Sequence, residues 1–387
     1  MVVVELAFGL WLLRFTPPGT DARDFVLLGQ RYVSQSHIST AITVPAAYRR
    51  YLNHTGYDGQ FYYYIALDPL NARFYLDKPA YRYSHIAYPL AARLLALGSP
   101  ALVPLALIAL NVLAIAVGTL AVAAWLKRRG YTPWLALVYG LSPGLFVSLW
   151  YDLAEASAFA LVAVAVWLFD GAGRRRLLTS GAAFALAALT RETTAIVASV
   201  YGLSLLAGVG ERAGLHARLR AHGPTALGFL TLSCGPLLLY EGFLRLWLGP
   251  STTPVTAGSL LVPFHGLWAA RPWSQFIVES IRAVVLPALI CACIALWALW
   301  RRLGDRNVWT LLALFEVTVV SLPADSYDIV FSTARIGLGL PLFALYCLPR
   351  FDILMGKRRL WLWLCTALWL SLLVFWFDFN SVHHNFR

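Results

Sequence analysis

Charge is scarce in this chain of 387 residues. Only 13% of the residues are Asp, Glu, Lys or Arg, while 59% are hydrophobic and the mean hydropathy is +0.67. So little charge excludes a water-soluble globular surface and indicates a polytopic membrane protein. The apolar runs are roughly 15 to 26 residues long, whereas an outer-membrane barrel has alternating segments of about ten residues. We therefore expect helices, not strands, to cross the bilayer.

Cysteines and short catalytic motifs are also few. The five cysteines lie in or beside apolar runs, which favours core packing over a disulfide framework or a zinc site. The sequence shows no internal repeat and no phosphate-cradling glycine loop, which argues against ATP-driven chemistry. The first apolar run carries Glu5 and lacks the basic region and cleavage site of a secretory signal, so we expect a membrane anchor.

Basic residues are what the chain has in excess, with a formal net charge of +12. They cluster between apolar runs, and the positive-inside rule makes such loops cytoplasmic. We therefore interpret the excess as a sign of topology and expect no nucleic-acid partner. The alternation predicts about eleven transmembrane helices with the C-terminus outside. These are expected at about 1–16, 101–126, 131–150, 153–169, 177–190, 193–208, 224–247, 281–300, 308–323, 333–349 and 359–377.

The predicted organisation is a single all-α transmembrane domain over residues 1–387. Residues 17–84 are expected to form a large first external loop with short interfacial helices. Residues 85–100 are apolar but too short to span, so they are expected to form an interfacial or re-entrant helix. The connections predicted to be external carry most of the polar residues of interest.

One acidic residue, Asp58, lies in the tyrosine-rich stretch "GYDGQFYYYIALDP" of the first external loop. Tyrosines favour the membrane interface, so Asp58 could be a turn or cap residue within an aromatic belt. The functional alternative is a general base or metal ligand held at the outer membrane surface. Arg82 and His85 follow three residues apart, which would place them on one helical face. They suit a phosphate, or else Arg82 snorkels to lipid headgroups.

Charged residues also interrupt later apolar runs at predicted external ends. Asp152 and Glu155 lie one turn apart, either as a functional pair on one helical face or as acids favoured at a helix start. Arg191 and Glu192 interrupt a long apolar stretch, where they could cap a tight hairpin or contribute to a phosphate site.

The late external loop adds Asp325, Tyr327 and Asp328, followed by Arg335 just inside a predicted span. The two acids could be exposed loop residues or functional residues, and the sequence favours neither. An arginine inside a predicted span is harder to explain by a structural role alone. The adjacent His383 and His384 lack further ligands nearby and do not indicate a metal site.

The order of these elements resembles the GT-C superfamily of integral-membrane glycosyltransferases, and most closely bacterial relatives of the GPI mannosyltransferases. The matching stretches are "YDGQFYYYIALDP" and "YRYSHIAYPLAARLLA", followed by "D..E" and "LTRE" at external helix ends. The chain has Tyr57 where eukaryotic members have Trp, and "IAYP" where "FPLYP" is expected, so sugar identity is not carried over.

The resemblance implies transfer of a sugar, with inversion, from a polyprenyl-phosphate donor to a lipid, glycan or protein acceptor. Asp58 would be the catalytic base. A lipid phosphate leaves as an anion and needs positive charge rather than a general acid, which fits the arginines. The expected substrate-binding residues are Arg82, His85, Asp152, Glu155, Arg191, Glu192, Tyr327 and Arg335.

We expect the protein to require no cofactor. Asp152 or Glu155 would orient the acceptor or hold a divalent cation, Mg²⁺ or Mn²⁺. The compact loops fit a bacterial inner membrane with the site facing outside. The alternative is a secondary transporter or flippase of lipid-linked saccharides, but transporters keep ionisable groups near the midplane and commonly show repeats. A non-catalytic subunit of the same architecture is a third reading.

Overall fold

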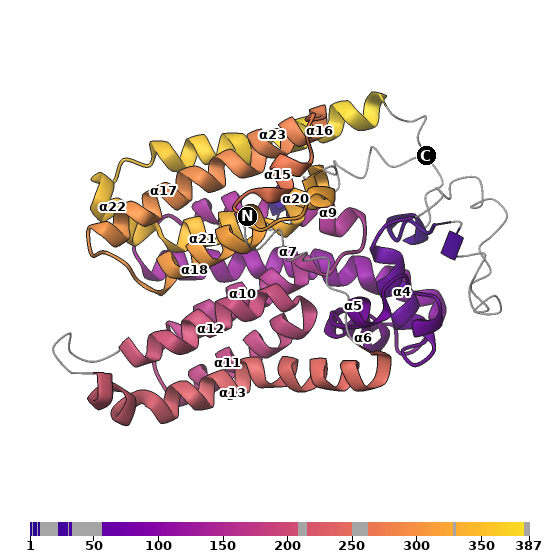
Figure 1. Ribbon diagram of the computed structural model, residues 1–387, viewed down its shortest axis with the longest axis horizontal. Coiled ribbons are helices and arrows are strands. Elements are labelled where there is room, and N and C mark those ends of the chain that lie inside the picture. The colour runs from indigo at the N-terminus through magenta and orange to yellow at the C-terminus, as the bar shows by residue number, and fades with distance from the viewer. Residues whose placement is uncertain are drawn as a thin grey trace.

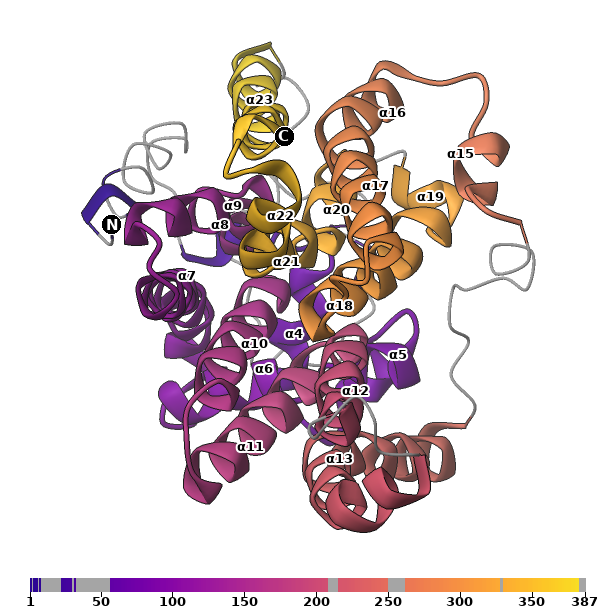
Figure 2. The same ribbon diagram turned by 90° about the vertical axis from the view of Figure 1, so that its left-hand side faces the viewer.

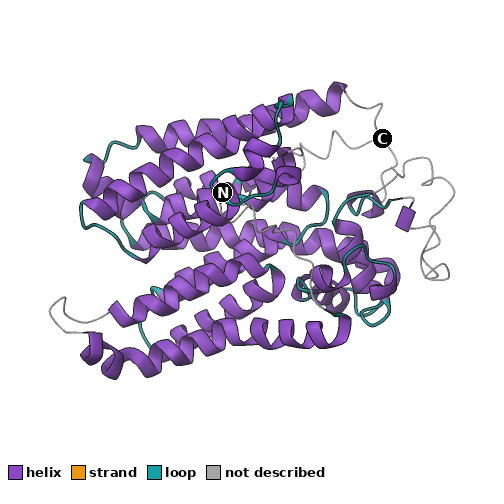
Figure 3. Cartoon of the chain, in the orientation of Figure 1, coloured by secondary structure: helices purple, strands orange, loops and turns teal. Residues whose placement is uncertain are grey.

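The computed structural model describes residues 1, 3–5, 7, 22–29, 31–32, 56–207, 215–249, 262–327 and 330–382. Throughout these residues the regular secondary structure is helical and no strand is present (Figure 3). The all-α prediction is therefore confirmed for this part of the chain. Most of the run at 1–16, residues 33–55 of the first external loop, Asp328 and the two terminal histidines lie outside the described residues.

The apolar runs predicted between residues 101 and 377 are almost entirely helical. Their helices are α7 (Val103–Arg128), α8 (Leu137–Gly140), α9 (Pro143–Trp150), α10 (Glu155–Phe169), α11 (Arg174–Thr190), α12 (Ala195–Ser204), α13 (Leu215–Leu248), α16 (Gln275–Ser280), α17 (Leu286–Trp300), α18 (Arg306–Phe315), α20 (Val330–Ile336), α21 (Gly339–Tyr346), α22 (Leu348–Met355) and α23 (Leu360–Val382).

Three helical stretches of the described chain are long and apolar enough to cross a membrane: Pro100–Arg128, Leu219–Leu248 and Gln275–Trp300. Two bent pairs raise the number to five if each is one broken span. These are Pro133–Gly140 with Pro143–Trp150, bent by 50°, and Phe331–Tyr346 with Leu348–Met355, bent by 57°. Several long apolar helices are compatible with a membrane protein. The finer number of eleven stays a prediction, because helices such as α10 fall short of the ~20 residues that a full crossing needs.

The helices run roughly along the long axis of the molecule (Figure 1). Helix α10 packs between α7 and α11, and α13 covers α11 and α12, while α17 packs against α18 and α23. Seen from one end, these sets form a lower and an upper group of helices (Figure 2). The turns that join α17 to α18 and α22 to α23 lie at the left end in Figure 1, opposite α4–α6. The basic clusters at 301–306 and 350–359 therefore lie far from these short helices.

The short helices α4 (Gly59–Leu67), α5 (Pro79–Tyr83) and α6 (Ala87–Leu95) fall in the predicted external loop at 17–84 and the predicted interfacial segment at 85–100. The expected short helix at 85–100 is present as α6. Every residue of α4 is buried, with Tyr62 and Tyr64 fully inaccessible. These tyrosines therefore pack inside the protein rather than forming the interfacial belt that the sequence suggested. Their burial builds a second apolar core beside the main one.

Two glycines allow the close backbone contacts that bring the site together. A Cβ built on Gly59 would lie 2.0 Å from the carbonyl oxygen of Tyr151, so only glycine lets the start of α4 touch the turn before α10. A Cβ on Gly144 would lie 2.5 Å from the carbonyl oxygen of Ala334 and 3.1 Å from Arg335 Cα. Gly144 thus sets how closely α9 approaches α20, and with it the position of Arg335.

Candidate active site

Asp58 is held between two arginines. Its Oδ1 lies 2.9 Å from Arg82 Nη1 and its Oδ2 accepts a hydrogen bond of 2.5 Å from Arg335 Nη2. The Asp58 side chain is 23% exposed, while both arginine side chains are at least nine-tenths buried. Asp58 occupies the N-cap position of α4 but its side chain caps nothing. The carboxylate therefore serves the ion pairs and not the helix end.

The ion pairs continue on both sides of Asp58. Arg335 Nη1 donates to Glu155 Oε1 at 2.9 Å, and Arg191 Nη1 lies 3.4 Å from the same oxygen. On the other side, Asp77 accepts two hydrogen bonds from Arg82, at 2.8 and 2.9 Å. We call the connected set the charge cluster. It comprises Asp58, Asp77, Arg82, His85, Glu155, Arg191, Glu192 and Arg335.

His85 links Arg191 to Glu192 within the charge cluster. Its Nε2 lies 3.0 Å from Arg191 Nη1 and 2.8 Å from Glu192 Oε2. One ring nitrogen thus faces a cation and a carboxylate. It can accept from Arg191 when the ring is neutral and donate to Glu192 when the ring is charged. Burial alone would raise the pKa of Glu192, but the charges of His85 and Arg191 outweigh it and hold that pKa well below its usual range.

Most members of the charge cluster lie at helix ends. The two residue pairs that were expected to share one face of a helix do not do so. Arg82 lies in α5, which ends at Tyr83, and His85 follows in the turn before α6. Asp152 lies in the turn before α10, whereas Glu155 is the first residue of that helix. In each pair only one residue belongs to a helix, because the helix ends or begins between the two residues. Neither pair therefore lies on one helical face. Tertiary packing, not helical spacing, brings Arg82 and His85 into one cluster.

Arg191 and Glu192 lie in the tight hairpin between two helices that the sequence allowed. Arg191 follows the last residue of α11 in an extended conformation, and Glu192 begins a single 3₁₀ turn that leads into α12. A long apolar stretch is thus broken into two helices by a charged pair. Both side chains also take part in the charge cluster, while their contribution to a phosphate site stays a prediction.

Aromatic rings flank the arginines. The guanidinium carbon of Arg82 lies 4.2 Å from the ring centroid of Phe61, and that of Arg335 lies 5.3 Å from the ring of Tyr57. The ring of Tyr81 meets the His85 ring edge to face at 5.2 Å. Cation–π contacts of this kind stabilise desolvated guanidinium groups. The aromatic residues around Asp58 therefore wall the site and lower its dielectric constant.

The two arginines decide the charge of Asp58. Burial alone would raise the pKa of Asp58, but the positive charges of Arg335 and Arg82 outweigh burial and hold that pKa well below its usual range. A carboxylate in this state is a weak base. Asp58 can act as a good proton acceptor only after at least one arginine has found another anionic partner.

The depressed pKa of Asp58 predicts where its contribution to stability is lost. Because the folded-state pKa lies below the ordinary 3.8, the contribution is complete above about pH 5 and falls as the pH drops below about 4. The check is the free energy of unfolding of wild type minus that of Asp58→Asn, measured in detergent from about pH 7 to pH 3. If this difference in the free energy of unfolding already decreases between about pH 7 and 5, the arginines do not lower the pKa of Asp58.

Asp152 and Tyr327 lie apart from the charge cluster. Asp152 is fully buried in a left-handed conformation with φ of 48°, and neither carboxyl oxygen has a hydrogen-bond partner. Burial raises the pKa of Asp152 well above its usual range. Tyr327 lies in α19 (Ala324–Tyr327) within the main core, and its hydroxyl donates to the Val319 carbonyl at 2.5 Å. The contacts of Tyr327 are those of a packing residue.

The carboxylates do not form an obvious metal site. Among the described residues, no group of three or more His, Cys, Asp or Glu side chains is arranged to hold a metal ion. Glu155 Oε1 already faces two arginines, so a cation there would have to displace positive charge. The donor set of Asp152 and Glu155 therefore does not fit the divalent cation that the sequence left open.

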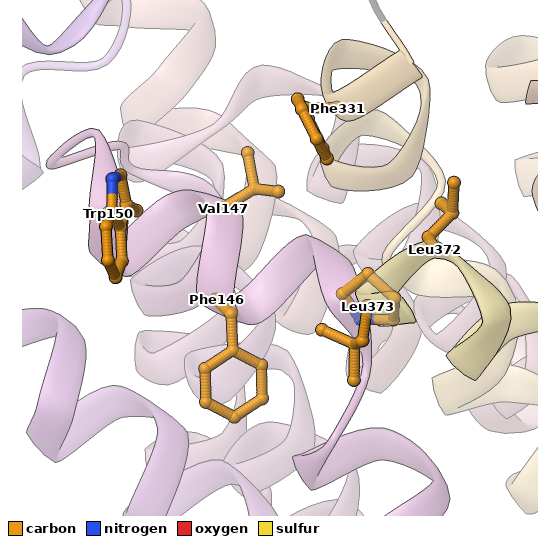
Figure 4. Close-up of a pocket in the computed structure, with 7 residues that line it drawn as sticks. Phe146, Val147, Trp150, Phe331, Leu372 and Leu373 are labelled. Carbon is orange, nitrogen blue, oxygen red and sulfur yellow. The ribbon is translucent and has the colours of Figure 1, made fainter. Parts of the chain in front are cut away.

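A narrow apolar groove lies between α9, α20 and α23. Apolar side chains of these three helices face it (Figure 4). A second narrow groove shares two residues with the first, Pro143 and Leu372, and is also lined by Gly144 and Ala334. A Cβ built on Gly144 would lie 3.1 Å from Arg335 Cα, so the second groove comes close to the backbone of α20 at Arg335. The two grooves are therefore neighbours, and both are lined by residues of α20, the helix that carries Arg335.

Asp77 was not among the candidates drawn from the sequence, although it holds Arg82 with two hydrogen bonds. It precedes Arg82 by five residues, and only the fold of the intervening turn shows that the two side chains meet. The sequence otherwise identified seven of the eight members of the charge cluster. Comparisons of the chain with protein-family models, curated proteins and solved structures found no match. The chemistry of the site therefore has to be argued from its own geometry.

Proposed function

We propose that this protein is an inverting membrane glycosyltransferase that moves a sugar from a polyprenyl-phosphate donor to an acceptor hydroxyl. One observation carries the proposal: three buried arginines hold Asp58 and Glu155, and the helix that carries Arg335, α20, also lines an apolar groove. Arginines suit a phosphate, the groove suits a hydrocarbon chain, and Asp58 suits an acceptor hydroxyl. A soluble sugar nucleotide would need no such groove.

The reaction follows from the exchange of partners within the charge cluster. When the donor binds, its phosphate oxygens take the place of the Asp58 carboxylate on Arg82 and Arg335. Asp58, released from both arginines, accepts the proton of the acceptor hydroxyl as that oxygen attacks the anomeric carbon. The bond between that carbon and the phosphate oxygen breaks, and the leaving polyprenyl phosphate keeps the electron pair. The arginines stabilise its negative charge.

The topology in this proposal is the eleven-span arrangement with the charge cluster on the outer face of a bacterial inner membrane. The basic turns at 301–306 and 350–359 lie at the end of the molecule away from α4–α6, which supports this orientation under the positive-inside rule. The lipid chain would enter from the bilayer along α9 and α23. The acceptor, whether lipid, glycan or protein, would approach Asp58 from the outer side, where its carboxylate is partly exposed.

The proposal needs no resident cofactor. Arg82, Arg191 and Arg335 supply the positive charge that a metal ion would supply in other phosphate sites. Transfer measured with and without a chelator, and with added Mg²⁺ or Mn²⁺, tests this part directly. Loss of turnover on chelation, restored by either ion, would contradict it.

The experiment that tests the proposal uses purified full-length protein in detergent and a panel of radiolabelled polyprenyl-phosphate sugars. The expected result is binding of at least one donor and transfer of its label to an acceptor supplied as membrane lipid, glycan or peptide. Consumption of no donor across the panel, in protein that is folded by thermal unfolding, would overturn the proposal. Uptake of a lipid-linked saccharide by proteoliposomes without transfer would favour the flippase alternative.

The groove makes a separate prediction about the lipid chain of the donor. Leu373→Trp should fill the groove and raise the Kd for a long-chain polyprenyl phosphate roughly tenfold, since overpacking that costs about 1.4 kcal/mol has that effect. Val374→Trp is the matched control, because Val374 is 70% exposed and does not line the groove. A short-chain phosphate should bind both variants and wild type alike. If Leu373→Trp weakens the binding of long-chain and short-chain phosphates equally, the lipid chain of the donor does not bind in this groove.

A further inference from the structure

A second buried acid lies far from the charge cluster. Glu5, in the N-terminal segment, is 5% exposed, and neither of its carboxyl oxygens has a hydrogen-bond partner. The hydroxyls of Thr119 in α7 and Tyr139 in α8 are also fully buried and lie close to Glu5, and the Thr119 hydroxyl is near enough to stabilise the Glu5 carboxylate. Native proteins leave few buried polar groups unsatisfied, so such a group calls for an explanation.

These groups share one small space. A Cβ built on Gly140 would lie 1.9 Å from Glu5 Oε1 and 2.6 Å from Thr119 Oγ1, and a Cβ on Gly118 would lie 3.0 Å from Tyr139 Oη. Gly140 therefore leaves free the volume that the carboxyl group occupies. A side chain at this position would push Glu5 out.

The space lies near the middle of the bilayer and at a break in a helix. Thr119 is nine residues before Arg128, the last residue of α7, and so about 14 Å along the helix axis from that end. This is roughly half of the ~30 Å hydrocarbon thickness. Gly140 ends α8, where the pair α8 and α9 bends by 50°. Broken helices at this depth commonly bind ions or protons in membrane proteins.

A bare carboxylate at this depth is very unfavourable, and the described structure gives Glu5 no cationic side chain as partner. The groups that face it are the Met1 amino group on its own segment, Thr119 from α7 and Tyr139 from α8. We propose that Glu5, Thr119 and Tyr139 form an intramembrane site that takes up a single positive charge, as a proton or a monovalent cation. Occupation of the site would hold Glu5 against the break between α8 and α9.

The inference does not depend on the glycosyltransferase proposal, because its test measures stability and not transfer. The thermal unfolding midpoint of the full chain in detergent is followed across neutral to alkaline pH, with choline chloride or NaCl as the salt. For a proton site, the wild-type midpoint falls as the pH rises, whatever the salt. For a cation site, NaCl raises the midpoint at alkaline pH and choline chloride does not. In both cases Glu5→Gln is expected to abolish the response.

The matched control is Glu279→Gln, which removes a carboxylate that already pairs with Arg282 at the end of α16. That variant should respond to pH and salt as wild type does. The same response in wild type and Glu5→Gln would overturn the proposal. If Glu5→Gln fails to fold, Thr119→Val and Tyr139→Phe replace it, since both keep the carboxyl group and remove one of its neighbours. Responses identical to wild type in both of these variants would likewise overturn it.

Discussion

Replacement of Asp58 by Asn is expected to lower the turnover of sugar transfer by about 10²–10⁴-fold, the usual contribution of a general base. Donor binding should stay equal or become tighter, because the amide no longer competes with the donor phosphate for Arg82 and Arg335. Each arginine keeps a second carboxylate, Asp77 or Glu155, so the variant should fold. The measurements are the initial rate at saturating donor and the Kd of the donor lipid phosphate.

The control is Asp68→Asn, at the other end of α4. The Asp68 carboxylate accepts hydrogen bonds from Leu70 and Asn71 at the surface, away from the arginines, and its replacement should leave turnover unchanged. Comparison of the initial rate with the Kd of the donor distinguishes a catalytic role of Asp58 from a structural one. If Asp58→Asn weakens donor binding as much as it slows transfer, Asp58 is a structural residue. Turnover near wild type would remove it as the base.

Replacement of Arg335 by Met is expected to destabilise the protein by about 3 kcal/mol. Arg335 joins Asp58 to Glu155 in a buried position, and breaking a buried ion pair leaves charge without compensation. The loss should lie at the low end of the usual range because Arg82 and Arg191 still face the two carboxylates. Unfolding in detergent with increasing denaturant measures it.

The double variant with Glu155→Gln should lose less stability than the sum of the two single variants, since removing both charges removes the unpaired one. Arg350→Met is the control for loss of an arginine. Arg350 is 38% exposed in its pair with Asp305, and exposed ion pairs contribute below about 1 kcal/mol. Equal destabilisation by Arg335→Met and Arg350→Met, or strict additivity with Glu155→Gln, would show that the buried pairs are not coupled.

The helical elements could be predicted from the sequence because hydrophobic run length alone reports them. The length of an apolar run is a poorer guide to the number of membrane spans. The run at 131–150 predicts one helix, but the structure has two helices, α8 and α9, bent by 50°. Proline and serine at the break, in "LSPG", were the only local sign. The burial of Tyr62 and Tyr64 could not be predicted, because an interfacial and a buried tyrosine have the same local sequence.

The candidate site was found for a simple physical reason: charges are rare in this chain, so each one near an external helix end stood out. What the sequence could not show is how they pair. Asp58 looked like a lone carboxylate, but the structure places three further acids in the same cluster, and two arginines bind Asp58 itself. Pairing depends on where α4, α5, α10 and α20 pack, and no local pattern encodes that packing.

The separation of Asp58 and Arg335 in the chain has a consequence for biosynthesis. The two residues lie 277 positions apart, so Asp58 is synthesised long before its second arginine exists. At about 5–20 residues per second, the interval is on the order of tens of seconds. During that time Asp58 can pair only with Arg82. A chain that stops before α20 therefore cannot complete the charge cluster, and the cluster forms only after the chain has been made as far as Arg335.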